Sequence, residues 1–399
     1  MNIAIILRRI DVRGGTQRLA LELAKFLKRN GHIVTFYTLR FAPEKAHDEF
    51  TAFKVVVHTA SGSTFLSRLG ILGVFIQEAR DAKVLAKRID TSTEVLNPHD
   101  QVSYKVAAYA KRRLKHVPSV WTMNDMPTRK ASFEREREVN PHLMRGLVKK
   151  IMHSIVDWFD IHLFIKPQDA IAVLDHRDQS WVKRDYGKHA EVIRTGVTIP
   201  VDQIRKRDHL KTPPRLLLFA HIQPHRRFED VIHAVALLKK EHITTHLTIA
   251  GKESDAEYTR FIRLLVAEQG LEESVTFMTR SLEDKEVEAL YAESDIFLNP
   301  SHFQSWGIAV FEALGRGVPV VVSNTVGASE VLTDGTNGLM VKAKDPTSIK
   351  DALKKLIQDK GVFQSLSSNG VEFVREHITW EIYGRHMLAL FKKFHKSGK

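Results

Sequence analysis

Residues 295–324 read DIFLNPSHFQSWGIAVFEALGRGVPVVVSN, which is the clearest structural signal in the chain. The runs DIFLNPS (295–301) and VPVVVSN (318–324) each predict a buried strand. Between them, 307–317 places apolar side chains on almost every side of a helix, which is typical of a buried helix. A strand, a helix and a second strand in this order predict a βαβ unit with parallel strands.

The same alternation continues on both sides of this unit. Earlier runs that predict strands, each followed by a helical pattern, are RLLLFAHI (215–222), HLTIAG (246–251) and SVTFM (274–278). Later segments predict a helix over ASEVLTD (328–334), a strand over GLMVKA (338–343) and a helix over PTSIKDALKKLIQD (346–359). Regular alternation of strands and helices predicts a parallel sheet with helices on both faces.

The first half of the chain opens in the same way. NIAIIL (2–7) predicts a buried strand, and a turn at Gly14-Gly15 leads into a helix for which Thr16 is the candidate N-cap. IVTFYTL (33–39) predicts the next strand. These elements predict a second βαβ unit with a glycine turn between strand and helix.

The segment 197–215 contains three prolines and scattered charges without an apolar period, so it predicts a linker. We therefore expect an α/β protein with one Rossmann-like domain over 1–200 and another over 201–379. An amphipathic helix over 380–399 ends the chain, and we consider its packing back on the first domain.

Composition excludes several classes of protein. No run of about 18 apolar residues occurs, which excludes a membrane-spanning helix. The chain has no cysteine, which excludes disulfides, thiolate zinc sites and cysteine nucleophiles. At the N-terminus the charges follow the apolar run, the reverse of a signal peptide, so we expect a cytoplasmic location.

The net charge of +13 is distributed unevenly. Residues 1–200 hold 33 Lys and Arg against 21 Asp and Glu, whereas 201–399 hold 27 against 26. The excess favours an anionic partner for the first domain, with simple solubility as the alternative. LMRGLVKKIMHSIVDWFDIHLFIK (143–166) predicts a basic amphipathic helix that lies either on anionic lipid or against the core. No DNA-binding motif or basic-aromatic platform is visible, so we expect no nucleic-acid partner.

Glu312 is the one acid in the apolar helix 307–317. A buried carboxylate is costly unless it has a partner, which is either a structural group such as Arg316 or the hydroxyls of a ligand. Ser305, Trp306 and Gly307 come directly before this helix. Backbone N–H groups at such a helix start can bind an anion.

PSHFQSWGIAVFEALGRGVPVVVS (300–323), followed by GASEVLTDGTNGLMV (327–341), resembles the donor-binding signature of glycosyltransferase family 4. Members are retaining enzymes of the GT-B architecture, two doubly wound Rossmann-like domains that face a central cleft. The resemblance implies that Glu312 holds the nucleotide ribose, next to the turn Ser305-Trp306-Gly307. Gln304 stands where the family has a glutamate that contacts the transferred sugar, so this sequence departs from the pattern there.

LLLFAHIQPHRRFEDVIHAV (216–235) resembles the family segment that carries a basic pair for the diphosphate. The matching positions are His221 and Arg226, where Arg and Lys are more usual. The turn at Gly14-Gly15 resembles the family's N-terminal glycine loop, whose backbone approaches the donor phosphate or the acceptor.

The segment VPSVWTMNDMP (117–127) has Asn124 where many members have histidine. An asparagine cannot act as a general base, so Asp125 becomes the candidate. His99, in LNPHD (96–100), is a further loop candidate.

The resemblance implies a glycosyltransferase of the hexosyltransferase type, which moves a sugar from a nucleotide-sugar donor to an acceptor hydroxyl. We expect a lipid-linked or membrane-surface acceptor and a protein that is peripheral on the inner face of a membrane. No Asp-x-Asp occurs, so we expect no metal and no other cofactor, with basic side chains and a helix dipole neutralising the diphosphate.

Two alternatives stay open. One is the same chemistry on a soluble acceptor, such as a sugar phosphate. The other is a non-catalytic nucleotide-sugar-binding protein with a degenerate site, an interpretation that rests on Gln304, His221 and Asn124.

Overall fold

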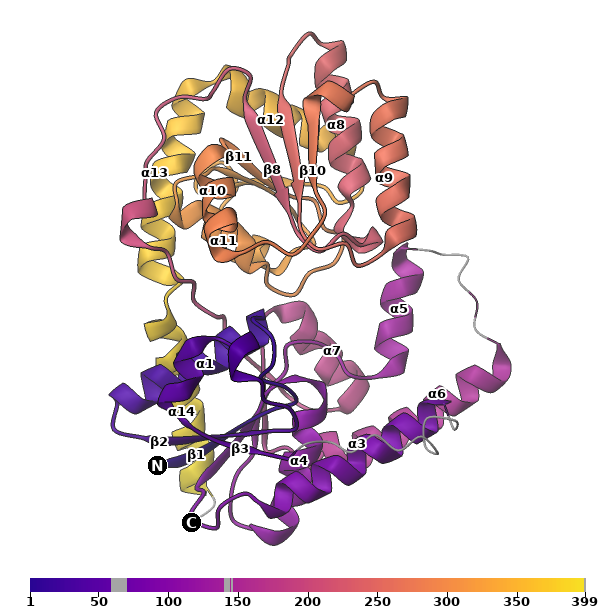
Figure 1. Cartoon of the computed structure of the whole chain (residues 1–399), viewed down its shortest axis with the longest axis vertical. Helices are drawn as coiled ribbons and strands as arrows, with labels where there is room; N and C mark the ends of the chain where they lie inside the picture. The colour runs from indigo at the N-terminus through magenta and orange to yellow at the C-terminus, as the bar shows by residue number, and fades with distance from the viewer. Residues whose placement is uncertain (59–69, 140–143, 145, 398–399) are drawn as a thin grey trace. The chain divides into compact units, whose positions relative to one another are not determined.

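The computed structural model describes residues 1–58, 70–139, 144 and 146–397. The chain forms two compact units, and Figure 1 shows their elements. Unit 1 contains Met1–Thr195 together with Trp380–Lys399, and unit 2 contains Gly196–Thr379. Unit 1 therefore contains both ends of the chain. No helix of the described part is long and apolar enough to cross a bilayer.

Unit 1 is built on parallel strands. A four-stranded sheet has the order β3-β2-β1-β4, and a three-stranded sheet has the order β5-β6-β7. Single bridges from Leu96 to Ser119 and from His99 to Thr122 connect the two sheets between β4 and β5. The strand bounds are β1 Asn2–Leu7, β2 Ile33–Thr38, β3 Lys54–Val57, β4 Val95–Pro98, β5 Val120–Thr122, β6 Ala170–Val173 and β7 Glu191–Val192.

Alternate residues of β1 face different helices, as the two-residue period of a strand requires. Ile3 and Ile5 pack with side chains of α1 and α14, whereas Ala4 and Ile6 pack with those of α3 and α4. Both faces of the sheet are therefore covered. The helices of unit 1 are α1 Gly15–Arg29, α3 Gly70–Lys87, α4 Asp100–Arg113, α5 Arg129–Val139, α6 Leu147–Asp160, α7 His176–Tyr186 and α14 Trp380–Ser397. A π-helical turn, Ile161–Ile165, extends α6, and short 3-10 turns span Pro43–Lys45 and Asp48–Ala52.

The last helix, α14, packs against α1 (Figure 1). Tyr383, Met387 and Phe391 are buried in the same cluster as Phe26 of α1. A Cβ atom on Gly384 would lie 2.3 Å from Cγ of Phe26, so only glycine permits this approach of the two helices.

Unit 2 contains a six-stranded parallel sheet with the order β10-β9-β8-β11-β12-β13. Its first strand in the chain, β8, pairs with β9 on one side and with β11 on the other. The strand bounds are β8 Arg215–Phe219, β9 His246–Ala250, β10 Val275–Met278, β11 Ile296–Asn299, β12 Val320–Ser323 and β13 Leu339–Val341.

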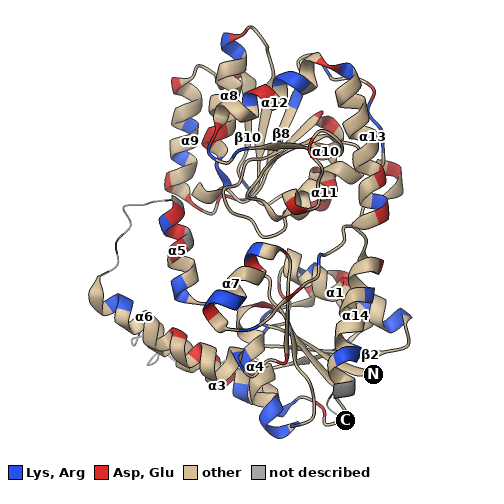
Figure 2. Ribbon diagram, turned by 180° about the vertical axis from the view of Figure 1, so that it is seen from behind, with Lys and Arg blue, Asp and Glu red and all other residues tan. Residues whose placement is uncertain are grey.

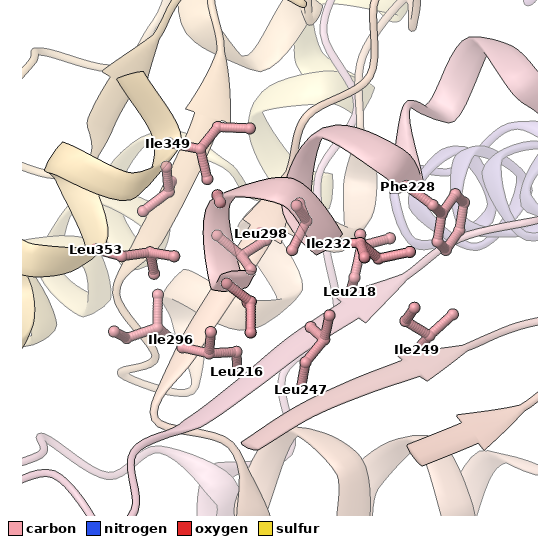
Figure 3. Packing of buried hydrophobic residues seen from close by; sticks show 14 of the residues in the cluster. Leu216, Leu218, Phe228, Ile232, Leu247, Ile249, Ile296, Leu298, Ile349 and Leu353 are labelled. Atoms are coloured by element: carbon pink, nitrogen blue, oxygen red, sulfur yellow. The ribbon is translucent and has the colours of Figure 1, made fainter. Parts of the chain in front are cut away.

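The core of unit 2 lies between the sheet and its helices. Figure 3 shows Leu216 and Leu218 of β8 packed with Ile232 of α8 and Leu353 of α12. The helices are α8 Phe228–Lys240, α9 Ala256–Glu268, α10 Asp284–Glu293, α11 Ile308–Gly315, α12 Pro346–Gln358 and α13 Lys360–His377. Short 3-10 turns span Val201–Gln203, Pro224–Arg226, Glu272–Ser274 and Gly327–Glu330.

Several local expectations were wrong. The predicted linker 197–215 is not free chain, because the backbone N–H of Arg207 donates to Ser367 Oγ (2.8 Å) and its guanidinium donates to the Tyr291 carbonyl (2.7 Å). The helix expected over 328–334 is only the 3-10 turn Gly327–Glu330. Gly14, not Thr16, is the N-cap of α1.

Candidate functional site

The predicted residues of unit 2 lie on the loops that follow β8 and β11, except Glu312, which lies on α11 directly after the second of these loops. The chain places β9 on one side of β8 and β11 on the other, which creates a topological switch point between β8 and β11. Ligands of doubly wound sheets bind at the carboxyl ends of the strands at such a point. The backbone N–H of His302 donates to the carbonyl of His225 (2.9 Å), so the loops after β8 and β11 meet directly.

Arg226 lies in the loop after β8, in the turn Pro224–Arg226. Its Nε and Nη1 atoms are buried and have no hydrogen-bond partner among the residues the structure describes. Burial lowers the pKa of Arg226 to about 10, so the guanidinium is still a cation at neutral pH. A buried cation without a counter-charge is costly, which makes this group a candidate for binding an anion.

Arg227 differs from its neighbour. It has a left-handed backbone (φ 57°), and its guanidinium forms two hydrogen bonds to the Asp230 carboxylate (2.9 and 2.7 Å). A further ion pair joins it to Glu229 at 2.6 Å. Arg227 therefore stabilises the start of α8, and of these two arginines Arg226 is the one available to a ligand.

His221 follows β8 on the same loop, and its Nδ1 atom lies 3.0 Å from Ser254 Oγ. Partial burial lowers the pKa of His221, and the nearby Arg226 and Lys252 lower it further. These surroundings favour the neutral imidazole. His221 is thus better suited to hydrogen bonding than to charge neutralisation.

Gln304 lies on the loop after β11 and is held on two sides. Its Oε1 accepts a hydrogen bond from Asn299 Nδ2 (3.0 Å), and its main-chain carbonyl accepts one from Gly327 N–H (2.9 Å). Asn299 is the last residue of β11, so the sheet itself positions the Gln304 side chain.

The turn Ser305-Trp306-Gly307 brings the chain into α11. Gly307 has a left-handed backbone (φ 83°), and a Cβ atom there would lie 3.0 Å from Val326 Cγ1. Trp306 is buried, with its ring 4.5 Å from that of Phe311. The helix is shorter than the expected 307–317, because Gly307 is its N-cap and Arg316 its C-cap.

Glu312 lies on α11 and accepts a hydrogen bond from the Tyr291 hydroxyl through Oε2 (2.9 Å). Arg316, which we considered as a structural partner of this carboxylate, donates instead to the main-chain carbonyl of Glu312 (3.0 Å) and to Gln203 (2.7 Å). Burial raises the pKa of Glu312, although Tyr291 and Arg316 partly offset the effect. Among the described residues no hydrogen bond reaches Oε1, which leaves it for a ligand hydroxyl.

Tyr291 was not expected from the sequence. It lies on α10, its ring packs at 4.8 Å from the Arg316 guanidinium, and its hydroxyl orients the Glu312 carboxylate. Nothing in the helical pattern DKEVEALYAES distinguishes this tyrosine from an ordinary core aromatic residue.

In unit 1 the glycine turn meets the loop after β5. Asn124 Nδ2 donates to Thr16 Oγ1 (3.3 Å), which brings Asn124 and Asp125 to the start of α1 beside Gly14 and Gly15. Asn124 Oδ1 is buried without a hydrogen-bond partner in the described part of unit 1. The Asp125 carboxylate accepts the backbone N–H of Met126 (2.8 Å).

His99 is fully buried rather than placed on an open loop. Its Nε2 atom lies 2.7 Å from Asn97 Oδ1, and burial lowers its pKa to about 3. Such an imidazole is neutral and shielded, so we regard His99 as part of the core.

Comparison with known families covers nearly the whole chain. A model described as Glycosyltransferase Family 4 matches residues 13–199, and one described as Glycosyl transferases group 1 matches residues 201–373. The chain belongs to glycosyltransferase family 4. This family 4 glycosyltransferase is an enzyme, and its fold is GT-B.

One relative and two solved structures illustrate the similarity, each of which aligns with most of the family 4 glycosyltransferase. The D-inositol 3-phosphate glycosyltransferase of Nocardioides sp. is 25% identical, over 95% of this chain and 85% of the relative. Anabaena HepE, solved with UDP and glucose, has a TM-score of 0.70 at 16% identity and covers 98% of this chain and 100% of its own. WaaG, a glycosyltransferase involved in lipopolysaccharide biosynthesis, has a TM-score of 0.67 at 16% identity and covers 96% and 98%.

Proposed function

We propose that this enzyme transfers a glycosyl group, with retention at the anomeric carbon, from a nucleotide-sugar donor to a hydroxyl carried at a membrane surface. The observation that carries the proposal is the buried Arg226 cation at the switch point of unit 2, which has no counter-charge among the described residues. A nucleoside diphosphate supplies the negative charge that this site lacks.

Arg226 is the proposed diphosphate ligand. The negative charge on the leaving diphosphate grows as the glycosidic bond breaks, and a guanidinium that is already in place stabilises that charge without reorganising. HepE, which has the same fold, was solved with UDP and glucose, and this supports a nucleotide-sugar donor for the present enzyme.

Glu312 is the proposed ribose ligand. Tyr291 holds one carboxylate oxygen and leaves the other directed away from that hydrogen bond. A carboxylate oxygen is a strong acceptor for a sugar hydroxyl. The backbone at Ser305-Trp306-Gly307 adds N–H donors at the start of α11.

Gln304 and His221 are the proposed contacts to the transferred sugar and the phosphate next to it. Both are neutral hydrogen-bonding groups in the surroundings described above, and both replace charged residues of the family pattern. We propose that they select the donor rather than abolish binding, because Arg226 and Glu312 keep the charges that the nucleotide requires.

The reaction needs no dedicated protein base in this proposal. The acceptor hydroxyl attacks the anomeric carbon on the face from which the diphosphate leaves. The bond from that carbon to the phosphate oxygen breaks, the bond to the acceptor oxygen forms, and the acceptor proton passes to the departing phosphate. Asn124 cannot take a proton, and the Asp125 carboxylate is engaged by the Met126 N–H. A Cβ atom on Gly15 would meet nothing within 4 Å, whereas one on Gly14 would lie 2.6 Å from Gln17 Oε1, so the open space beside this loop is at Gly15.

The proposed acceptor lies at a membrane surface, with the protein peripheral on the cytoplasmic face. The excess of positive charge in 1–200 supports an anionic surface as the partner of unit 1. The alternative, a soluble phosphorylated acceptor, is supported by the name of the Nocardioides relative, a D-inositol 3-phosphate glycosyltransferase.

The test is a thermal-shift panel of UDP, GDP, ADP and their sugar derivatives, followed by donor hydrolysis with the derivative that binds. A ligand that binds only the native state raises the melting temperature in proportion to the logarithm of its concentration. We expect one nucleoside diphosphate to stabilise the protein and its sugar derivative to be hydrolysed slowly. Stabilisation without hydrolysis or transfer would support the non-catalytic alternative, and no stabilisation would refute the donor site.

A further inference from the structure

Helix α6 (Leu147–Asp160) turns its apolar face toward solvent. Leu147, Ile151, Ile155 and Trp158 are 72%, 51%, 48% and 55% exposed, and their spacing of three and four residues places them on one stripe. Phe159, on the edge of this stripe, is also exposed. We call these five side chains the α6 stripe. Leu143 and Arg145, which belong to the amphipathic segment predicted from the sequence, lie outside the described residues.

The acids of α6 point inward and fix the rotation of the helix. The buried Asp157 accepts hydrogen bonds from the backbone N–H groups of Arg129 (3.1 Å) and Lys130 (2.9 Å). The buried Asp160 accepts one from the Tyr104 hydroxyl (2.9 Å) and lies 3.5 Å from Lys105 Nζ. Rolling the helix to cover the α6 stripe would break all of these contacts, so its exposure follows from the packing of unit 1.

The neighbouring helix, α3, also directs its acidic side chains away from solvent. α3 packs beside α6, and Figure 2 shows blue and red segments along both ribbons. The red segments are not at the surface. Glu78 is partly buried against Lys105 (2.8 Å), and Asp81 is buried and accepts hydrogen bonds from Gln77 (3.0 Å).

The charged side chains that α3 and α6 do expose are all basic. On α3 they are Arg80, Lys83 and Lys87, and on α6 they are Lys149 and Lys150. Within these two helices as described, no Asp or Glu side chain is in the exposed class. An apolar stripe beside exposed lysines and arginines is the pattern of a helix that lies in the interface of an anionic bilayer.

A second copy of the chain fits this surface less well. A two-fold contact brings the same patch of both copies together, so the basic residues beside one stripe would meet the same basic residues of the other copy. The two helices expose no acid to compensate them. Anionic lipid headgroups supply that charge, and a tryptophan is suited to the headgroup level because its ring is apolar and its N–H is polar.

We propose that the α6 stripe inserts into the interface of an anionic membrane while Lys149, Lys150 and the basic residues of α3 contact lipid phosphates. The role of this docking rests on the proposed function, since it brings the enzyme to the surface that carries its acceptor. The docking itself is a property of unit 1.

Binding of the full chain to vesicles tests the proposal. The vesicles contain either phosphatidylcholine alone or phosphatidylcholine with about 30% phosphatidylglycerol, the anionic component that the basic residues require. We expect binding to the anionic vesicles that weakens steeply with salt. Replacing Ile151 and Ile155 by Gln keeps good helix formers at exposed positions and should lower vesicle affinity by about 10-fold or more.

The matched control replaces Phe261 and Leu264, exposed apolar residues of α9 in unit 2, by Gln. This control should bind vesicles like the unmodified chain, and both variants should keep its melting temperature and its response to nucleotide. Equal loss in both variants, or no vesicle binding at low salt, would overturn the proposal. A dimer that dissociates in the Ile151/Ile155 variant, without vesicle binding, would assign the stripe to self-association instead.

The two proposals fail separately. Hydrolysis of a nucleotide sugar without binding to anionic vesicles would support the proposed donor chemistry and contradict the docking surface. Binding to anionic vesicles without binding to any nucleotide would contradict the proposed function and support the docking surface.

Discussion

Arg226 and Arg227 are neighbours in the chain, but their guanidinium groups have opposite surroundings, and their substitutions should have opposite effects. Arg226→Ala removes a buried cation that has no counter-charge among the described residues. Stability should be unchanged or slightly higher, while kcat falls by about 10²–10³-fold and KM changes less, since the leaving-group charge is greatest in the transition state. Steady-state kinetics and thermal unfolding of the same preparation measure both.

Arg227→Ala is the control. It leaves Asp230 buried without its partner, which should cost about 1–3 kcal/mol of folding free energy and lower the melting temperature by several degrees. Its kcat, measured well below the melting temperature, should stay close to that of the unmodified enzyme. A loss of kcat for Arg227→Ala equal to that for Arg226→Ala would contradict the assignment of the anion site.

Glu312→Gln separates stability from binding. The raised pKa means that the folded state binds a proton more tightly than the unfolded state, so this group's stabilising contribution is present below about pH 4.5 and is lost as pH rises through the folded pKa. At pH 7 the charged form is the costly one, and Gln still accepts the Tyr291 hydrogen bond. The melting temperature should therefore not fall, while nucleotide affinity falls by about 10-fold or more.

The pH dependence of binding gives an independent check on Glu312. Nucleotide affinity of the unmodified enzyme should fall on acidification at a pH above 4.5, where Glu312 becomes protonated. Titration calorimetry of the Gln variant should show no such fall. An unchanged affinity in Glu312→Gln would remove this residue from the site.

Among the site residues, sequence reasoning could locate loops but not partners. The position of Arg226 after a strand and before a helix was readable from the chain. The sequence did not show that Arg226 lacks a counter-charge while Arg227 pairs with both Glu229 and Asp230. This difference depends on the left-handed backbone of Arg227, which turns its side chain toward the start of α8. Tyr291 was missed for the same reason: its contact with Glu312 joins two helices, α10 and α11, that only the packing of unit 2 brings together.

At the scale of elements, the junction of α1 and α14 gives a prediction about stability. Gly384 allows α14 to approach Phe26, since a Cβ atom would lie 2.3 Å from its ring. Gly384→Val should therefore push α14 away from α1 and cost about 1–3 kcal/mol, as overpacked sites do. Limited proteolysis should cut the variant near the C-terminus faster than the unmodified chain.

The control for that experiment is Gly361→Ala on α13. Gly361 is exposed, and its nearest neighbour would be Asp359 Oδ1 at 3.3 Å from the new Cβ atom. Alanine in a helix generally stabilises relative to glycine, so no loss is expected. A Gly384→Val variant that unfolds and resists protease like the unmodified chain would show that α14 contributes little to unit 1.

Hydrophobic patterns predicted the strands and most helices because their periods reflect burial directly. The segment 295–324 yielded both β11 and β12. The pattern of α6 was also clear, yet it could not tell which face lies inward. An apolar face normally packs on the core, whereas here the contacts of Asp157 and Asp160 hold the opposite face inward. The segment 328–334 shows another limit: its helical pattern is short, and only the 3-10 turn Gly327–Glu330 forms there.

For the whole enzyme, we predict transfer without a divalent metal. The chain contains no Asp-x-Asp, and in the proposed site Arg226 supplies the positive charge that faces the diphosphate. Activity should persist in excess chelator. Complete loss that added Mg²⁺ or Mn²⁺ reverses would contradict both the metal-independent mechanism and the role of Arg226.

The bounds of the two units determine which fragment of the chain could be used to test the charge asymmetry. Sequence reasoning placed the first domain at 1–200 and considered that 380–399 packs back on it. In the structure unit 1 includes α14, whose Tyr383, Met387 and Phe391 complete the cluster around α1. A fragment ending at residue 200 would lack α14 and expose that apolar surface to water. It would then bind vesicles through this newly exposed surface rather than through its charge. The charge asymmetry is therefore best tested with the full chain, as in the vesicle experiment.

The chain leaves unit 1 once and returns to it once, and the two crossing points are adjacent. The N–H of Val197 donates to the carbonyl of Ile378 (3.1 Å), so unit 2 begins and ends at neighbouring positions. We expect that unit 2 can be exchanged with that of a homologue by joining the chains at 195/196 and 379/380, because its two ends lie next to each other. If the proposed roles of the two units hold, such an exchange would change the donor sugar without changing the membrane docking of unit 1.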